Sequence, residues 1–585
     1  MRAYLWTAVV LLAVVAAIHV VRIASISRPI LARNIRQIGY WIALALIFSL
    51  ATWLRFDLRQ DPIPDPDTWG YLSPALRKLT GGEFGHTWGR NFVYPGFLFL
   101  LLQMFGDFRA ISVAQHLLGI IAGAMLLLTW RRVRVFAPPL GVGHDLHAPL
   151  GLIALSMFLL SAEPIQAETQ IRPEAVCAFL FSINLYLVVD FTACGFVEYR
   201  CSRAVAAGAG SVFTAILLAS ARPSFWFVAA ASLLPVAIFS LRRGWLRQKL
   251  ALAGSVAATA ALLWLPEYVL SRHDEVSRTF LPTTLFVVHA DLIRDQIAHD
   301  LARNRELPYS HSSLRHVHLL LSKAITQSHA AGRYPRLGFN PDDLRYDPTS
   351  VTEQLRREFR NDVSALCAFY RFYYWRVWQQ RPLSMLKKIA GQMGVFYGPQ
   401  CPAYTLTKSL PLSRDYEGDF AVLKWPAYRE IWASYRPAVD FMNRTRLLAQ
   451  DAPTIQQSVY VRRPLTVLAQ TYRPILLVAL VSSVLVLCRQ TYRRSLGWLA
   501  ALILFAYSYN FAACLEVAVV QSLEVGRFTT VQVFPTIIAQ FLAIWLVLEF
   551  ALKLVLAEKN IRVIRAYFGD PGRLLAFCPK IKILA

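Results

Sequence analysis

Charged residues are scarce in this sequence, and their scarcity excludes an ordinary soluble protein. Only 17% of the 585 residues are Asp, Glu, Lys or Arg, whereas about 25% is typical of a soluble domain. The mean hydropathy is +0.41. Uncharged apolar runs close to the roughly 20 residues that cross a bilayer recur along most of the chain. We therefore expect an all-α integral membrane protein with many spans.

Cysteine and the common cofactor motifs are also sparse. The eight cysteines form no CxxC pair, which argues against a zinc or iron–sulfur site. No P-loop, GxGxxG, Ser/His/Asp or haem motif stands out. Histidines gather in 267–330, but His316 and His318 lack a clear third ligand, so we expect surface residues there. Cys367 and Cys401 lie in the large hydrophilic region, and the sequence leaves open whether they form a disulfide.

Acidic residues are too few to balance the basic ones. Lys and Arg number 61 against 36 Asp and Glu, which gives a net charge of +25. On a soluble chain this surplus would suggest nucleic acid, but on a membrane chain it first indicates topology, because Lys and Arg collect in cytoplasmic loops. Apolar spans are predicted at 4–22, 38–55, 108–130, 148–163, 174–192, 204–220, 224–241, 249–266, 466–488, 496–514 and 529–551.

Basic residues follow alternate spans. They are Arg22, Arg28, Arg33 and Arg36; Arg131, Arg132 and Arg134; Arg242, Arg243, Arg247 and Lys249; Arg489, Arg493 and Arg494; and Lys559, Arg562, Arg565, Lys580 and Lys582 in the tail. Placing all of them in the cytoplasm gives about 11 transmembrane helices, with the N-terminus outside as a retained first helix and the C-terminus inside. Loops 56–107, 164–173, 267–465 and 515–528 then share the outer side.

This topology divides the chain into four parts. Residues 1–266 form an N-terminal transmembrane module, 267–465 a mostly helical extracytoplasmic region, 466–551 the C-terminal transmembrane helices, and 552–585 a basic cytoplasmic tail. Within the outer parts, 91–105 is apolar but too short to span, and 370–398 is rich in Tyr, Trp and Arg. Both segments are predicted to be interfacial helices. The basic surplus of the outer region suits anionic headgroups or phosphates, or it is simply a solvated basic surface.

The first outer loop carries the most distinctive polar chemistry. Asp57, Asp61, Asp65 and Asp67 fall within eleven residues directly after a predicted span, and on a helix Tyr71 would share a face with Asp67. A carboxylate at a half-dry interface can take a proton from an acceptor hydroxyl, which is worth roughly 10²–10⁴ in rate. The alternative is a solvated acidic loop in which Asp67 caps a short helix.

The order of these features resembles the GT-C superfamily of integral membrane glycosyltransferases. An aspartate after an early span, a tyrosine four residues later, a short helix ending in Gly and an aromatic-Pro apolar helix are most similar to protein O-mannosyltransferases and lipid A aminoarabinose transferases. The resemblance implies a GT-C fold with Asp67 as the catalytic residue and Tyr71 beside it. The family often has Asp-Glu where this chain has Asp67-Thr68, which leaves open whether Asp65 shares the role.

Later segments extend the resemblance. IRPEAVCAFLFSINLYLVV (171–189) is similar to the family's second acidic segment and places that acid at Glu174, with Glu168 as the alternative. LASARPSF (218–225) matches a recurring Arg-Pro at Arg222. SLEVGRFTTVQVFPTII (522–538) resembles a late Glu…Arg-Tyr…Pro segment, with Phe where tyrosine is usual. It adds Glu524 and Arg527 to the implied substrate-binding residues.

Each of these residues also has an ordinary structural interpretation. An arginine fork suits the phosphate of a lipid-linked sugar, but Arg222 could be a helix-end anchor, and Arg527 could pair with Glu524 at i, i+3. Glu174 could simply complement the positive end of a helix.

The function implied by the resemblance is that of an inverting glycosyltransferase. Its donor would be a polyprenyl-phosphate-type sugar lipid, and its acceptor an envelope glycan, lipid or protein. We expect contact with membrane lipids, no nucleic-acid partner, a bacterial inner-membrane location and an active site on the periplasmic face. No metal ligand is predicted, and the sequence leaves open whether a divalent cation takes part. The alternatives are a transporter or flippase of lipid-linked glycans, which predicts repeated halves, and a surface-polysaccharide polymerase or ligase.

Overall fold

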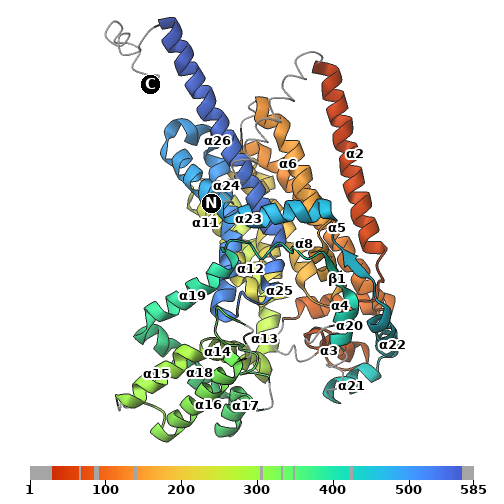
Figure 1. The fold of residues 1–585 in the computed structure, drawn as a ribbon, viewed down its shortest axis with the longest axis vertical. Helices are drawn as coiled ribbons and strands as arrows, with labels where there is room; N and C mark the ends of the chain where they lie inside the picture. The colour runs from red at the N-terminus through yellow and green to blue at the C-terminus, as the bar shows by residue number, and fades with distance from the viewer. Residues whose placement is uncertain are drawn as a thin grey trace.

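The computed structural model describes residues 29–568, apart from 65–66, 85–90, 138–140, 304–306, 331, 333, 347–348 and 420–425. The predicted span 4–22, the residue Asp65 and the end of the predicted tail lie outside the described residues. Nearly every described element is a helix (Figure 1). The chain is therefore an all-α protein, as predicted.

Nine helices in the described part of the chain are long and apolar enough to cross a membrane. They are Gln37–Phe56, Arg109–Phe136, Glu174–Val197, Cys201–Ala221, Pro223–Leu241, Leu246–Val269, Val459–Cys488, Gln490–Val520 and Val533–Val555. A tenth candidate is the pair Leu146–Leu159 and Ala162–Thr169, which is bent by 44°. These ten coincide with the predicted spans from 38–55 onward, so the prediction of a multi-pass membrane protein is confirmed.

The helices of the candidate spans are α2 (Pro29–Phe56), α5 (Arg109–Val133), α6 (Gly141–Leu159), α7 (Ala162–Thr169), α8 (Glu174–Thr192), α9 (Cys201–Ala221), α10 (Trp226–Ser232), α11 (Leu234–Leu241), α12 (Leu246–Thr259), α13 (Leu265–His273), α23 (Val459–Cys488), α24 (Gln490–Val520) and α26 (Val533–Phe568). Most of them are labelled in Figure 1, except α7, α9 and α10. Short 3₁₀ or π segments continue four of them, at Arg134–Phe136, Ala193–Val197, Pro223–Phe225 and Ala260–Trp264.

Lipid-facing and protein-facing sides of the bundle differ as expected for a membrane protein. α2 exposes Trp41, Leu46 and Trp53 by more than half of their surface, because a single helix at the edge of a bundle is covered by lipid instead of protein. Elsewhere, small residues let helices approach closely. A Cβ at Gly151 would lie 2.4 Å from the indole of Trp130.

Two groups of helices lie at one end of the bundle, which we call the site end (Figure 1). The helical lobe contains α14 (Glu275–Val288), α15 (Ala290–Ala302), α16 (His311–Ala330), α17 (Val351–Glu358) and α18 (Val363–Gln380), and α19 (Pro382–Phe396) follows it. The hairpin lobe contains α20 (Leu412–Asp419), α21 (Pro426–Ala433), α22 (Arg436–Asp451) and the antiparallel strands β1 (Ser409–Pro411) and β2 (Thr454–Gln456), with Leu410 opposite Ile455.

The predicted interfacial segments form helices, with one correction. The segment 91–105 gives α4 (Val93–Phe105), whereas 370–398 is not one helix. It breaks between α18 and α19 at Arg381, where φ is −137° and ψ is 51°, because a residue before proline is disfavoured in the helical region. α3 (Thr68–Leu79) from the first loop packs against α4 and α21.

Candidate active site

Asp67 and Arg527 form an ion pair at the site end. Asp67 occupies the residue before α3, as the capping interpretation requires, but its carboxylate makes no side-chain cap bond to that helix. It contacts instead Nη1 of Arg527, which lies in the short helix α25 (Gly526–Thr530) between α24 and α26. About a third of each side chain is exposed, 29% for the aspartate and 36% for the arginine. The pair therefore joins the first loop of the bundle to its last.

Glu174 and Arg222 form a second, more deeply buried pair beside the first. Oε1 of Glu174 lies 3.1 Å from Nη1 of Arg222, and each side chain is less than a tenth exposed. Glu174 begins α8 after Pro173, while Arg222 ends α9 in an extended conformation before Pro223. Proline cannot continue a helix from its preceding turn, so both prolines place their charged neighbours at helix ends. Because Arg222 is buried, it does not snorkel as a helix-end anchor would.

Phe528 brings the two pairs into one site. Its ring centroid lies 4.9 Å from Cζ of Arg222 and 5.1 Å from Cζ of Arg527. Such cation–π contacts are most favourable where water is excluded. Burial acts to lower the pKa of Arg527, but the nearby carboxylates of Asp67 and Glu174 outweigh it and raise that pKa above its ordinary value. Arg527 is therefore a permanent cation held between two acids.

Two tyrosines, one from α3 and one from α4, lie beside the ion pairs. The ring of Tyr71 meets that of Tyr94 edge-on, with centroids 5.2 Å apart, and the Tyr94 hydroxyl donates to Oε1 of Gln115 at 3.0 Å. Burial raises the pKa of Tyr94, and the charge of Glu174 and the neighbouring Tyr71 raise it further. Tyr94 is thus a neutral hydrogen-bond donor. The sequence offered a signal for it in the aromatic-Pro pair that begins α4.

Three buried polar atoms in this site have no hydrogen-bond partner among the described residues. They are Nε of Arg527, Nη1 of Arg222 and Oε2 of Glu174; the 3.1 Å contact between Arg222 and Glu174 lacks hydrogen-bond geometry. Native structures leave few such atoms unsatisfied. All three belong to the two neighbouring ion pairs, so both pairs keep hydrogen-bonding capacity that the described protein groups do not use.

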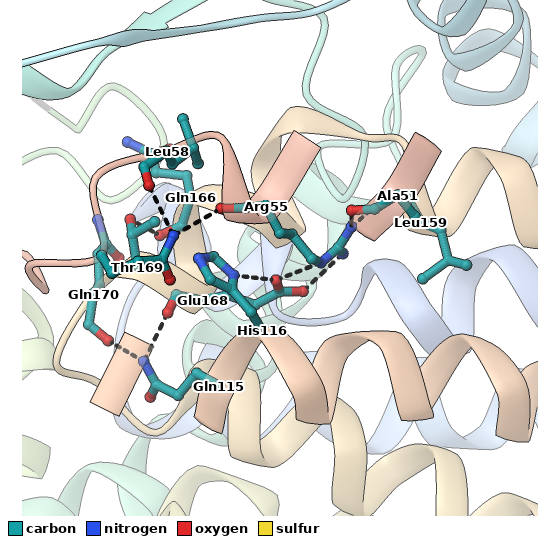
Figure 2. Close-up of polar contacts among 11 residues, drawn as sticks. Ala51, Arg55, Leu58, Gln115, His116, Leu159, Gln166, Glu168, Thr169 and Gln170 are labelled. Carbon is teal, nitrogen blue, oxygen red and sulfur yellow. Dashed lines mark hydrogen bonds and ion pairs between the residues drawn. The ribbon is translucent and has the colours of Figure 1, made fainter. Parts of the chain in front are cut away.

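Glu168 belongs to a separate buried network (Figure 2). Its carboxylate accepts from Nε and Nη2 of Arg55 at 2.7 and 2.9 Å and contacts Nδ1 of His116 at 2.9 Å. Arg55 is fully buried, and its Nη1 donates to the carbonyls of Ala51 and Leu159. This geometry occupies both oxygens of Glu168 with protein partners, so we assign the glutamate a structural part.

The same network positions the loop that leads to Asp67. Nε2 of Gln115 donates to the carbonyls of Glu168 and Gln170, both at 2.8 Å (Figure 2). Backbone bonds then join Ile63 to Thr169 and to Ile171, at 2.7 and 2.9 Å. Hydropathy analysis missed Arg55 because a window average hides one charge, although an ionisable residue at the end of a span is itself a signal.

Glu524 does not pair with Arg527, contrary to the i, i+3 interpretation. Its two carboxylate oxygens accept from the backbone N–H groups of Arg336 and Leu337, at 2.9 and 2.8 Å. The side chain of Gln392 in α19 holds the same segment, because its Oε1 accepts from Leu523 N–H at 3.0 Å. Glu524 therefore binds the α24–α25 connection to the segment between α16 and α17 of the helical lobe.

The described residues contain no group of three or more His, Cys, Asp or Glu side chains that could hold a metal ion. His316 is exposed, as expected. Cys367 and Cys401 are both free thiols and buried.

Comparison with known proteins gives a plain result. No protein-family model, curated protein or solved structure matches this chain. The site is therefore interpreted from its own geometry: Asp67, Tyr71, Glu174, Arg222 and Arg527 come together, while Glu168 and Glu524 serve neighbouring frameworks.

Proposed function

We propose that this chain is an inverting glycosyltransferase of the GT-C type, which moves a sugar from a polyprenyl-phosphate-type donor to a cell-envelope glycan, lipid or protein. The observation that carries the proposal is the contact of Asp67 with Arg527 at one end of a transmembrane bundle. It places a carboxylate that can act as a base beside a cation that can hold a phosphate. A membrane-anchored donor would bring its phosphate to this depth.

These groups supply a base for the acceptor and positive charge for the phosphate. The acceptor hydroxyl gives its proton to the Asp67 carboxylate, and its oxygen forms a bond to the anomeric carbon. The bond from that carbon to the phosphate oxygen breaks on the opposite side, and the phosphate leaves with the electron pair. Arg527 and Arg222 stabilise the charge that collects on the phosphate. One displacement gives one inversion of the anomeric carbon.

The buried neighbours support this assignment of roles. Because Glu174 already neutralises Arg222 in a setting less than a tenth exposed, that pair serves better as a fixed wall than as a proton acceptor. Asp67 is the more accessible acid of the two described acids in the site. We therefore propose Asp67 as the base, with Tyr71 and Tyr94 lining the sugar.

Orientation follows from the charge pattern. The ends of α5, α11 and α23 opposite the site carry Arg131, Arg132, Arg242 and Arg489. The positive-inside rule favours the cytoplasm for this end, which supports our proposal that the site lies on the periplasmic face of a bacterial inner membrane. A polyprenyl phosphate in the outer leaflet would reach it there.

The test is Asp67→Asn, with Asp57→Asn as the matched control because Asp57 is an exposed aspartate of the same loop. Membranes carrying each variant are supplied with lipid-linked sugar donors, and envelope lipids from a deletion strain and a complemented strain are compared by mass spectrometry. We expect Asp67→Asn to lower transfer by about 10²–10⁴ and Asp57→Asn to leave it unchanged. Normal transfer by Asp67→Asn at equal expression would refute the proposal and favour a flippase or a polymerase.

A further inference from the structure

The charges of the two ion pairs, which come from described residues of the site, balance before any substrate arrives. Two guanidinium groups face two carboxylates, with Arg527 on Asp67 and Arg222 on Glu174. A donor phosphate adds negative charge to this balanced set. It can be accommodated only if it takes an arginine that a carboxylate now holds, since a carboxylate and a phosphate on one fork repel each other.

The structure distinguishes which pair can exchange. The Glu174–Arg222 pair is less than a tenth exposed and has Phe225 and Phe528 against the guanidinium. The Asp67–Arg527 pair is about a third exposed on both sides. Breaking a buried pair leaves uncompensated charge and costs more than breaking an accessible one. Arg527 is therefore the arginine that can exchange its carboxylate for a phosphate at the lower cost.

Arg527 also has an unused donor for the incoming anion. It reaches Asp67 through Nη1, whereas its Nε is buried without a hydrogen-bond partner among the described residues. Phosphate oxygens bind an arginine fork through two parallel N–H donors. The present pairing with Asp67 leaves one of these donors unsatisfied, and a phosphate that spans the fork would satisfy both.

We propose that the donor phosphate replaces the Asp67 carboxylate on Arg527, so that Asp67 becomes an effective base only after the donor has bound. This inference rests on the proposed function and adds an order of binding to it, donor before acceptor. A cation in contact with a carboxylate stabilises its charged form and so makes it a weaker base. Removing that charge therefore restores basicity at the moment it is needed. Glu174, Arg222 and Tyr71 face the same site and remain in place throughout.

The experiment measures the protonation of Asp67 directly. The full chain in lipid nanodiscs is treated with a water-soluble carbodiimide and an amine at a series of pH values, and labelling of Asp67 is quantified by peptide mass spectrometry. The additions are polyprenyl phosphate, the matching polyprenol without phosphate, and inorganic phosphate. Asp61, held by Arg444 at 2.7 Å, is the internal reference.

We expect polyprenyl phosphate to raise the labelling midpoint of Asp67 by about 1–3 pH units, and the polyprenol to leave it unchanged. A rise with inorganic phosphate alone would show that the anion, not the lipid, drives the exchange. Arg527→Gln should show the raised midpoint without any addition and no further rise. Arg527→Lys keeps the charge and should keep the low midpoint, which separates loss of the pair from misfolding.

Two results overturn the inference in different ways. If polyprenyl phosphate binds, as measured by native mass spectrometry, but the Asp67 midpoint does not move, the exchange is wrong and the proposed donor stands. If polyprenyl phosphate binds no better than the polyprenol, both the exchange and the proposed function fail. An Arg527→Gln midpoint equal to that of the wild type also refutes the exchange.

Discussion

At the scale of single residues, the structure separates acids that hold the fold from acids that face a site. The carboxylate of Glu168 accepts two hydrogen bonds from Arg55, contacts His116 and is almost fully buried. The neighbouring helix leaves room for it with a glycine, because a Cβ at Gly119 would lie 1.9 Å from Oε1 of Glu168. Glu174 and Asp67, by contrast, pair with arginines that each keep a buried N–H donor without a hydrogen-bond partner among the described residues.

Removing the charge of Glu168 should destabilise the protein. Glu168→Gln leaves the guanidinium of Arg55 buried without its counter-ion, which typically costs about 3–5 kcal/mol. We expect a marked loss of thermal stability in detergent, measured by unfolding of the purified protein. Glu83→Gln, at an exposed site in the described part of the first loop, should leave stability unchanged. Equal stability of the two variants would contradict the structural part assigned to Glu168.

A buried histidine gives the stability of the helical lobe a pH dependence. Burial lowers the pKa of His289 to about 3, and the neighbouring Lys388 lowers it too, while the bond from its Nε2 to the Val519 carbonyl at 2.9 Å acts in the other direction. In the unfolded chain this pKa is about 6.5. Between these pH values the histidine is protonated in the unfolded state and neutral in the folded state. The free energy of unfolding is therefore highest above about pH 6.5, as far as this group is concerned, and falls as the pH drops toward 3.

The slope of the free energy of unfolding against pH shows whether His289 causes the effect. We expect its contribution to approach about 1.4 kcal/mol per pH unit in the middle of that range. His289→Gln should flatten the decline between pH 6.5 and 4, measured as the free energy of unfolding at each pH. Other titrating groups, including Asp291 beside Lys388, act in both proteins and cancel in the difference. Parallel curves for the two proteins would rule the histidine out.

At the scale of elements, the connection from α24 to α26 links α19 and the helical lobe to the site. Gln392 and the backbone of Arg336 and Leu337 hold residues 522–524, and three residues later Arg527 reaches Asp67. The position of the arginine is thus set by α19 and the helical lobe as much as by α25 itself.

Loosening that connection should weaken the hold of Arg527 on Asp67. Glu524→Ala removes two charge-assisted hydrogen bonds to backbone N–H groups, whereas Glu524→Gln keeps one acceptor oxygen. We expect donor KM to rise about tenfold in the alanine variant, as for the loss of roughly 1.4 kcal/mol of binding, with a smaller rise in the glutamine variant. A fall in kcat with unchanged KM would instead place Glu524 in the chemical step.

The elements themselves were largely predictable, and their long-range contacts were not. Spans such as 174–192 and 466–488 follow from local apolar runs, so the matching helices appear where expected. The break at Arg381 is also local, and the proline beside it could have predicted it. In contrast, Arg527 meets Asp67 across 460 residues, and no periodicity encodes that pairing. Arg336 and Leu337 bind Glu524 through their backbone N–H groups. Every residue except proline carries such a group, so the sequence does not mark these two residues as partners.

At the scale of the whole molecule, the two ends of the bundle differ in chemistry. The site end carries two lobes and the two arginine–carboxylate pairs, and the other end carries a compact ion network in which Arg132 pairs with Asp190 at 2.6 Å and with Glu198 at 2.7 Å. All these charges lie at or near helix ends and have partners of opposite charge, which agrees with the cost of charge at the bilayer centre.

Cysteine labelling tests the orientation. In a Cys201→Ser, Cys488→Ser, Cys578→Ser background, Glu83→Cys lies at the site end and Arg243→Cys at the other, and both positions are exposed. We expect a membrane-impermeant maleimide to label Glu83→Cys in intact spheroplasts and Arg243→Cys only after permeabilisation. The reverse pattern would place the site in the cytoplasm and refute a periplasmic enzyme.

The 460-residue separation of Asp67 and Arg527 also has a consequence for biosynthesis. A ribosome that adds about 5–20 residues per second needs roughly 20 to 90 s to cover that distance. Throughout this interval the aspartate has been synthesised and its arginine has not. Nascent or truncated chains therefore carry Asp67 without the positive charge of Arg527, and completion of α25 supplies that charge. A protease or chaperone that recognises this difference could sort finished molecules from unfinished ones.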